Sequence, residues 1–146
     1  MKKIENTTKI KASADKVWQV LMDESYYMQW YAAFGVGSKA TSDWKEGSKI
    51  IFSDDNGMGL IGTIAVLNPA KEFRVKMKGI LNDGVEDYDS DHTKGLELAE
   101  ERYVLTEAHG TTTLYTTADM DESWYDSMSV SWENALKKIK ELAEQH

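Results

Sequence analysis

The sequence of 146 residues has no cysteine and contains only one proline, three histidines and three phenylalanines. Without cysteine the chain has no disulfide framework, no thiol nucleophile and no Cys-ligated zinc site. Its longest wholly apolar runs extend over only a few residues, which is too short for a membrane span. The segment from Met1 to Ala12 is basic but has no apolar core, so it does not read as a secretory signal. We therefore expect a cytoplasmic protein.

Acidic residues outnumber basic ones by 25 to 17, giving a net charge of −8. A charge of this sign repels phosphate backbones and anionic lipid surfaces, so we expect no nucleic-acid partner. Segment 87–91 has aspartates at its first, third and fifth positions, as a calcium-binding loop does. However, position six is His92 where the loop needs glycine, and position twelve is Leu98 where it needs glutamate. The two internal histidines, His92 and His109, have no metal-ligand spacing. We therefore expect no metal and no cofactor.

Alternating apolar and polar residues predict that strands dominate the chain. Segment 2–11 alternates in this way, and the pattern returns from Lys39 to Asp119. Asn56-Gly57 and Asn68-Pro69 are turn sequences that divide this long region into antiparallel strands. The stretch 79–95 is polar and is expected to form a loop.

Apolar residues spaced three and four apart predict helices at both ends of this β-region. Ser13 is the expected N-cap of a first short helix, and a second runs from about Glu24 to Trp30. The final segment is the clearest helix, capped by Asp121 or Ser123. Its apolar stripe comprises Met128, Trp132, Ala135, Ile139 and Leu142. About 22 helical residues span about 33 Å, enough to cross a curved sheet.

These elements predict the α+β class and one domain over residues 1–146. A curved antiparallel sheet of about six or seven strands has one face to cover and a single long helix to cover it. We therefore expect a helix-grip fold, in which the sheet wraps around the C-terminal helix and two short helices follow the first strand.

Several motifs occur in a characteristic order along the chain. They are segment 10–18 followed by Trp30, Gly62-Thr63-Ile64 followed by Asn68-Pro69 and Phe73, Tyr103-Val104-Leu105 followed by segment 110–114, and Trp132 with Leu136. Together they resemble the START-like (SRPBCC) superfamily, which includes the birch-pollen allergen and the polyketide cyclases. The nearest branch resembles the bacterial homologues of the activator of the 90-kDa heat-shock protein's ATPase, in its C-terminal domain. This resemblance implies a hydrophobic pocket between sheet and helix but no particular reaction.

The predicted pocket is rich in aromatic and apolar side chains. The expected lining residues are Trp30, Tyr31, Phe34, Phe52, Ile64, Val75, Met77, Glu101, Tyr103, Met128, Trp132 and Ala135. Strand alternation sends Glu101 and Tyr103 to one face, and Glu100 and Arg102 to the other. A buried Glu101 would have a raised pKa and the capacity of a general base, whereas a Glu101 at the rim would pair with a Lys or Arg. Alternatively, the lining side chains fill the interior completely.

The sequence favours binding over catalysis, because it contains no nucleophile elbow and no pattern typical of a catalytic triad. The first hypothesis is non-enzymatic binding of a small hydrophobic or amphipathic molecule. The second is a stress-response module that binds a chaperone or another protein. The third is a cyclase or dehydratase that uses Glu101 or Tyr103 as its acid or base. The sequence is compatible with a monomer or a homodimer.

Overall fold

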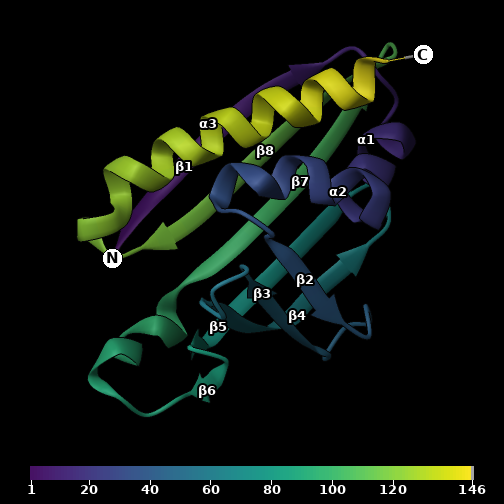
Figure 1. The fold of residues 1–146 in the computed structure, drawn as a ribbon. Coiled ribbons are helices and arrows are strands. Elements are labelled where there is room, and N and C mark those ends of the chain that lie inside the picture. The colour runs from purple at the N-terminus through teal and green to yellow at the C-terminus, as the bar shows by residue number, and fades with distance from the viewer. Residues whose placement is uncertain (146) are drawn as a thin grey trace.

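The long C-terminal helix lies across one face of a curved antiparallel sheet, with two short helices beside it (Figure 1). This computed structural model describes residues 1–145, so His146, the last residue of the predicted domain, lies outside the described part. The helices are α1 (Ala14–Met22), α2 (Glu24–Tyr31) and α3 (Glu122–Glu144). The strands are β1 (Lys2–Ile10), β2 (Lys39–Ser42), β3 (Lys49–Ser53), β4 (Gly59–Asn68), β5 (Glu72–Asn82), β6 (Val85–Asp87), β7 (Glu100–Ala108) and β8 (Thr111–Met120). Short 3-10 helices occupy Ala32–Phe34, Asp91–Thr93 and Leu96–Leu98.

The strands form one sheet in the order β1-β8-β7-β5-β4-β3-β2, with β6 paired to β5 outside this path. The predicted α+β helix-grip architecture is confirmed, and β6 makes the sheet eight-stranded. This short strand lies inside the stretch predicted as a polar loop. Asp83 and Gly84, with φ of 50° and 76°, form the turn that joins β5 to β6. An Asp-Gly pair favours such a turn, but the three residues of β6 show no apolar alternation.

Side-chain caps mark where the helices begin. The Ser13 hydroxyl accepts a hydrogen bond from the Lys16 backbone N–H at 3.1 Å, as its position before α1 predicts. At the start of α3, Asp121 rather than Ser123 is the cap, because its carboxylate accepts from the Ser123 N–H at 2.9 Å. Within residues 1–145, no helix is both long and apolar enough to cross a membrane.

The core lies between the concave face of the sheet and the apolar stripe of α3. Ile10 of β1, Leu114 of β8 and Ile139 of α3 are fully buried there. Helix α1 adds Val17 and two further buried residues from its inner face. Trp18 is half-buried and lies at the edge of the core. The concave face is therefore largely covered by helices, and the convex face of β5 and β7 carries charged side chains such as Arg74 and Arg102.

Candidate functional site

Aromatic rings from separate elements meet in the interior, and Tyr103 lies at their centre. Its ring centroid is 6.3 Å from that of Trp30 on α2, and 5.8 Å from those of Phe73 on β5 and Trp132 on α3. Trp132 in turn meets Phe34 edge-on at 5.1 Å. Offset and edge-on pairs at these separations are the favourable arrangements for aromatic rings. The sheet and the two helices are thus joined through a continuous set of rings.

The same set of rings extends along α2 towards the surface. Tyr31 meets Trp30 edge-on at 4.4 Å and stacks on Tyr27 at 4.7 Å. Tyr27 lies 6.0 Å from Trp44, which follows β2. Tyr31 is buried and also contacts Phe52 of β3 at 6.2 Å. Aromatic side chains therefore connect the interior beside Tyr103 to the outer edge of the sheet beside β2.

One carboxyl group lies within this aromatic interior. The Tyr103 hydroxyl donates a hydrogen bond to Oε1 of Glu101, two residues earlier on β7. Burial raises the pKa of Glu101 to about 7, although the hydrogen bond from Tyr103 acts in the opposite direction. The pKa of the Tyr31 and Tyr103 hydroxyls is also raised, mainly by burial and further by the neighbouring Glu101 charge. Glu101 can therefore hold or release a proton near neutral pH.

Two buried hydroxyl groups have no hydrogen-bond partner within residues 1–145: Thr116 Oγ1 on β8 and Ser129 Oγ on α3. Thr116 is the register partner of Tyr103, so both side chains lie on the concave face. Ser129 precedes Trp132 by one helical turn and lies on the same side of α3. An unsatisfied buried polar group costs about 1–3 kcal/mol. These hydroxyls are therefore candidate contacts for a bound molecule.

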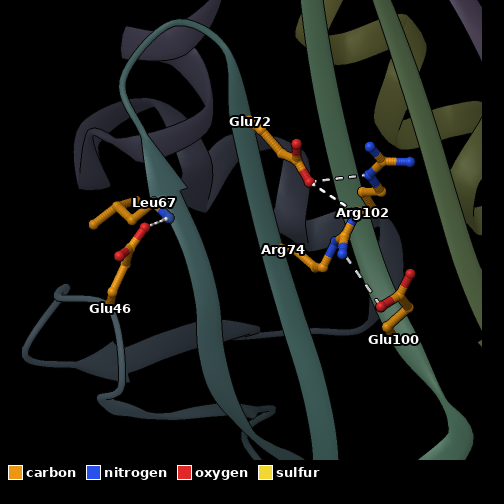
Figure 2. A network of polar contacts seen from close by, with 6 residues as sticks. All are labelled: Glu46, Leu67, Glu72, Arg74, Glu100 and Arg102. Carbon is orange, nitrogen blue, oxygen red and sulfur yellow. Dashed lines mark hydrogen bonds and ion pairs between the residues drawn. The ribbon is translucent and has the colours of Figure 1, made fainter.

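The convex face of the same strands has a different chemistry, shown in Figure 2. Arg74 of β5 and Arg102 of β7 stand directly opposite each other. Glu72 separates their charges, with its Oε2 3.0 Å from Arg102 Nε and 3.1 Å from Arg74 Nη2. Glu100 Oε2 lies 3.9 Å from Arg74 Nε. Nearby, a carboxylate oxygen of Glu46 accepts from the Leu67 N–H at 3.0 Å. Carboxylates on this face thus have charged or polar partners.

The structure places most of the predicted lining residues in the interior. The buried ones are Trp30, Tyr31, Ile64, Val75, Met77, Tyr103, Trp132 and Ala135. The half-buried ones are Phe34, Phe52, Glu101 and Met128. The predicted lining set did not include Tyr27, Phe73, Thr116 or Ser129. Phe73 shares the strand parity of Val75, and Thr116 that of Leu114, so alternation was the signal that pointed to them.

Two hollows lie on the outside of the molecule. One, of about 340 Å³, lies between α2 and β2 and is lined by Glu24, Tyr27, Met28, Lys39, Ala40, Thr41, Ser42 and Trp44. The other, of about 300 Å³, lies beside β6 and is lined by Asn82, Val85, Glu86, Asp87, Tyr88 and Asp89. Neither touches Glu101, but the first shares Tyr27 with the aromatic set. The cavity expected between sheet and helix stays a prediction.

The acidic stretch 87–91, considered above as a calcium loop, makes local hydrogen bonds. Asp87 Oδ1 accepts from the Asp89 and Ser90 N–H groups at 3.1 and 3.0 Å. These bonds, together with one from the Ser90 hydroxyl to the same carboxylate, lower the pKa of Asp87. Across residues 1–145, no group of three or more His, Asp or Glu side chains is arranged to hold a metal ion.

A curved antiparallel sheet that grips a long C-terminal helix over an aromatic interior defines the helix-grip class of proteins. Residues 11–144 match the family described as "Activator of Hsp90 ATPase homolog 1-like protein", and the chain belongs to this family. No curated protein matches the sequence.

Solved structures with low sequence identity share the fold. The Aha1 dimer of Colwellia psychrerythraea is 18% identical, with a TM-score of 0.73 over 99% of this chain and 97% of that one. Protein MLL2253 of Mesorhizobium loti is 15% identical, with a TM-score of 0.74 over 97% and 96%. CalU16 of Micromonospora echinospora is 20% identical, with a TM-score of 0.66 over 97% of this chain and 75% of that one. At these identities the likeness concerns the fold alone.

Proposed function

We propose that the protein binds a small amphipathic molecule between the sheet and α3. The apolar part of the ligand packs against the aromatic rings around Tyr103, and its polar group bonds near the Glu101 carboxyl. The observation that carries this proposal is the hydrogen-bonded Glu101–Tyr103 pair together with two hydroxyls that have no partner within residues 1–145, Thr116 on the neighbouring strand β8 and Ser129 on α3.

The chemistry of these residues supports binding. Small-molecule sites are mostly apolar, with a few polar groups that orient the ligand. Buried polar groups in native proteins nearly always have partners, so unpartnered hydroxyls indicate a place for a ligand or a bound water. Phe34 contacts Trp132 and is only half-buried, as is Met128 one helical turn before Trp132, so both are side chains that an entering ligand could displace.

Paired threonine substitutions test the proposal. Thr116 and Thr117 are adjacent and buried, and Thr117 is the register partner of Arg102, on the other face. A thermal-shift screen against fatty acids, sterols and aromatic amines and alcohols, followed by native mass spectrometry, identifies a binding probe. Thr116→Val should weaken its binding about three- to tenfold, as loss of one hydrogen bond implies.

The matched control is Thr117→Val, which makes the same chemical change on the convex face and should leave affinity unchanged. An equal loss in both variants would mean that the hydroxyl of Thr116 makes no contact with the ligand. If no compound in the screen raises the melting temperature or is detected bound to the protein by native mass spectrometry, the proposal of small-molecule binding is wrong.

Acid–base catalysis is a second candidate, and the pKa of about 7 for Glu101 is the observation that favours it. A general acid or base works best with a pKa near the operating pH. If a bound probe is turned over, Glu101→Gln should abolish turnover while binding is retained. Full turnover by that variant would contradict this role for Glu101.

The family description favours a third candidate, a protein-interaction module. A chaperone ATPase is the partner to assay, with pull-down and stimulation of ATP hydrolysis as the readouts. Since the Colwellia psychrerythraea relative is a dimer, a homodimer is the assembly to expect here. Light scattering measures this directly, and a monomer mass at high concentration would contradict it.

A further inference from the structure

The charge around the Glu101–Tyr103 pair is unbalanced. No lysine or arginine side chain is buried in residues 1–145. The half-buried ones are Lys16, Arg74, Arg102, Lys138 and Lys140. Lys16 contacts Tyr26, Arg74 and Arg102 share Glu72, Lys138 pairs with Glu141, and Lys140 pairs with Glu144. The half-buried basic side chains thus have partners elsewhere, and none of them is a partner of Glu101.

The groups that face Glu101 from the surrounding elements carry no positive charge. Its register neighbours are Val75 on β5 and Ala118 on β8. Tyr31 of α2 and Tyr103 of β7 are the titratable groups coupled to it. From α3, the aromatic ring of Trp132 contacts Tyr103. Among residues 1–145, an ionised Glu101 therefore has no counter-ion.

The neighbouring rings add to the same negative potential. The face of an aromatic ring is electronegative and attracts a cation within about 6 Å by about 0.5–2 kcal/mol. Tyr31 and Tyr103 neighbour the carboxyl group, and Trp132 contacts the Tyr103 ring. A positive group here would be attracted by the carboxylate, and further by any of these ring faces that it reaches, whereas a negative group would be repelled by the carboxylate.

The hydrogen-bonding groups of the site also favour a positively charged ligand. The Tyr103 hydroxyl already donates its proton to Glu101, so its oxygen is left as an acceptor. The ionised carboxylate is an acceptor only, and the unpartnered hydroxyls of Thr116 and Ser129 can rotate to accept. A ligand rich in N–H donors satisfies these groups best.

We infer that the ligand is an organic cation, an amine or ammonium group carried on an apolar body of aromatic size. This inference rests on the proposed function and names the chemical class of its ligand. A bound ammonium supplies the counter-ion that Glu101 lacks, and the apolar body packs among the rings around Tyr103. The raised pKa of Glu101 fits this assignment, because it reflects a buried carboxyl group with no positive charge beside it. A bound cation would favour the ionised carboxylate and lower this pKa towards its ordinary value.

The test compares three probes with one naphthyl body: 2-(1-naphthyl)ethylamine, 2-(1-naphthyl)ethanol and 1-naphthylacetate. Isothermal titration calorimetry at neutral pH should show the amine binding at least about tenfold more tightly than the alcohol, and the acetate more weakly than both. Equal affinities for amine and alcohol would overturn the cation assignment and leave the proposed function standing. If none of the three binds and no compound of the wider screen does, the proposed function itself fails.

The matched variants are Glu101→Gln and Glu100→Gln. The two positions are adjacent on β7, and Glu101→Gln changes the net charge of the protein by no more than Glu100→Gln does. Glu101→Gln should abolish the preference for the amine, and Glu100→Gln should retain it. If both variants lose the preference for the amine equally, the amine is attracted by the overall negative charge of the protein. If Glu24→Gln is the variant that loses this preference, the amine binds in the hollow between α2 and β2, and the assignment to Glu101 is overturned.

Proton release provides a readout that needs no variant. About one pH unit below the pKa of about 7, most Glu101 carboxyls hold a proton in the free protein. Binding of the amine should then release close to one proton per site, and binding of the alcohol should release none. Calorimetry in buffers of different ionisation enthalpy measures this difference. Amine binding without proton release would contradict the proposed ion pair even if Glu101→Gln failed to fold.

Discussion

Glu100 and Glu101 are adjacent on β7, yet their carboxyl groups lie on opposite faces of the sheet. Glu100 lies near Arg74 in the convex network of Figure 2, where water also screens the charges. Glu101 lies among aromatic rings, with the Tyr103 hydroxyl as its hydrogen-bond partner. The surroundings of a carboxyl group, and not its position in the chain, therefore determine its chemistry.

The largest effect is expected from removal of an interior ring. Trp132 is 3% exposed and contacts Tyr103 and Phe34, so Trp132→Ala should lower the free energy of unfolding by about 3–5 kcal/mol. Trp124 of the same helix is 64% exposed, and Trp124→Ala is the control, with an expected change within about 0.5 kcal/mol. Denaturant titration measures both. Similar losses in the two variants would contradict the packing described here.

The second effect is a pH dependence that only the concave carboxyl should show. The pKa of Glu101 rises from 4.5 to about 7 in the folded protein, so the folded state binds more protons than the unfolded state between these values. The free energy of unfolding should therefore fall as pH rises from about 4.5 to about 7, by at most about 3 kcal/mol. Denaturant titrations across this range should show the fall in the wild type and in Glu100→Gln. In Glu101→Gln the free energy of unfolding should change less with pH. If it falls as steeply in this variant as in the wild type, other groups cause the fall.

A third effect follows from removal of one hydroxyl group. Tyr103→Phe leaves Glu101 without its hydrogen-bond donor, which should cost about 1–3 kcal/mol of stability and raise the pKa of Glu101 further. NMR titration of labelled glutamate side chains measures this pKa, and denaturant titration measures the stability. The control is Tyr115→Phe, since Tyr115 donates to Glu5 on the convex face. The prediction is wrong if Tyr103→Phe leaves the pKa of Glu101 unchanged or lowers it.

The smallest effect concerns the convex network. Glu72→Gln leaves Arg74 and Arg102 facing each other without the carboxylate between them. Because partly exposed ion pairs contribute little, the expected loss of stability is about 0.5–1 kcal/mol. It should shrink in about 1 M NaCl, which screens both the attraction and the repulsion. Chemical denaturation with and without salt tests this, and a loss that persists undiminished at high salt would indicate a different cause.

Much of the fold was predictable because its signals are local. The Ser13 cap, the Asn56-Gly57 turn and the helical stripe that includes Trp132 and Ile139 each depend on residues close together in the chain. Gly57 has the positive φ of 72° that makes this turn inexpensive. The β6 hairpin was missed because its strand is short and lacks a buried face, so no periodicity revealed it.

The site was predictable in its composition but not in its contacts. Alternation along β7 separates Glu101 and Tyr103 from Glu100 and Arg102, and the structure has this arrangement. The sequence left open whether Glu101 pairs with a basic residue. It contains 17 lysines and arginines, and no local pattern tells whether any of them reaches Glu101.

The order of the helices and of every strand except β6, the pairs of β7 side chains that share a face and the apolar stripe of α3 all follow from the sequence. That rings from α2, β5, β7 and α3 meet at Tyr103 follows only from the packing of the folded chain. This packing also decided that Thr116 and Ser129 face the interior without partners, and that Arg74 and Arg102 lie on the convex face, away from Glu101. The physical reason is that periodicity acts over a few residues, whereas desolvation and charge pairing depend on side chains that the packing of distant elements brings together.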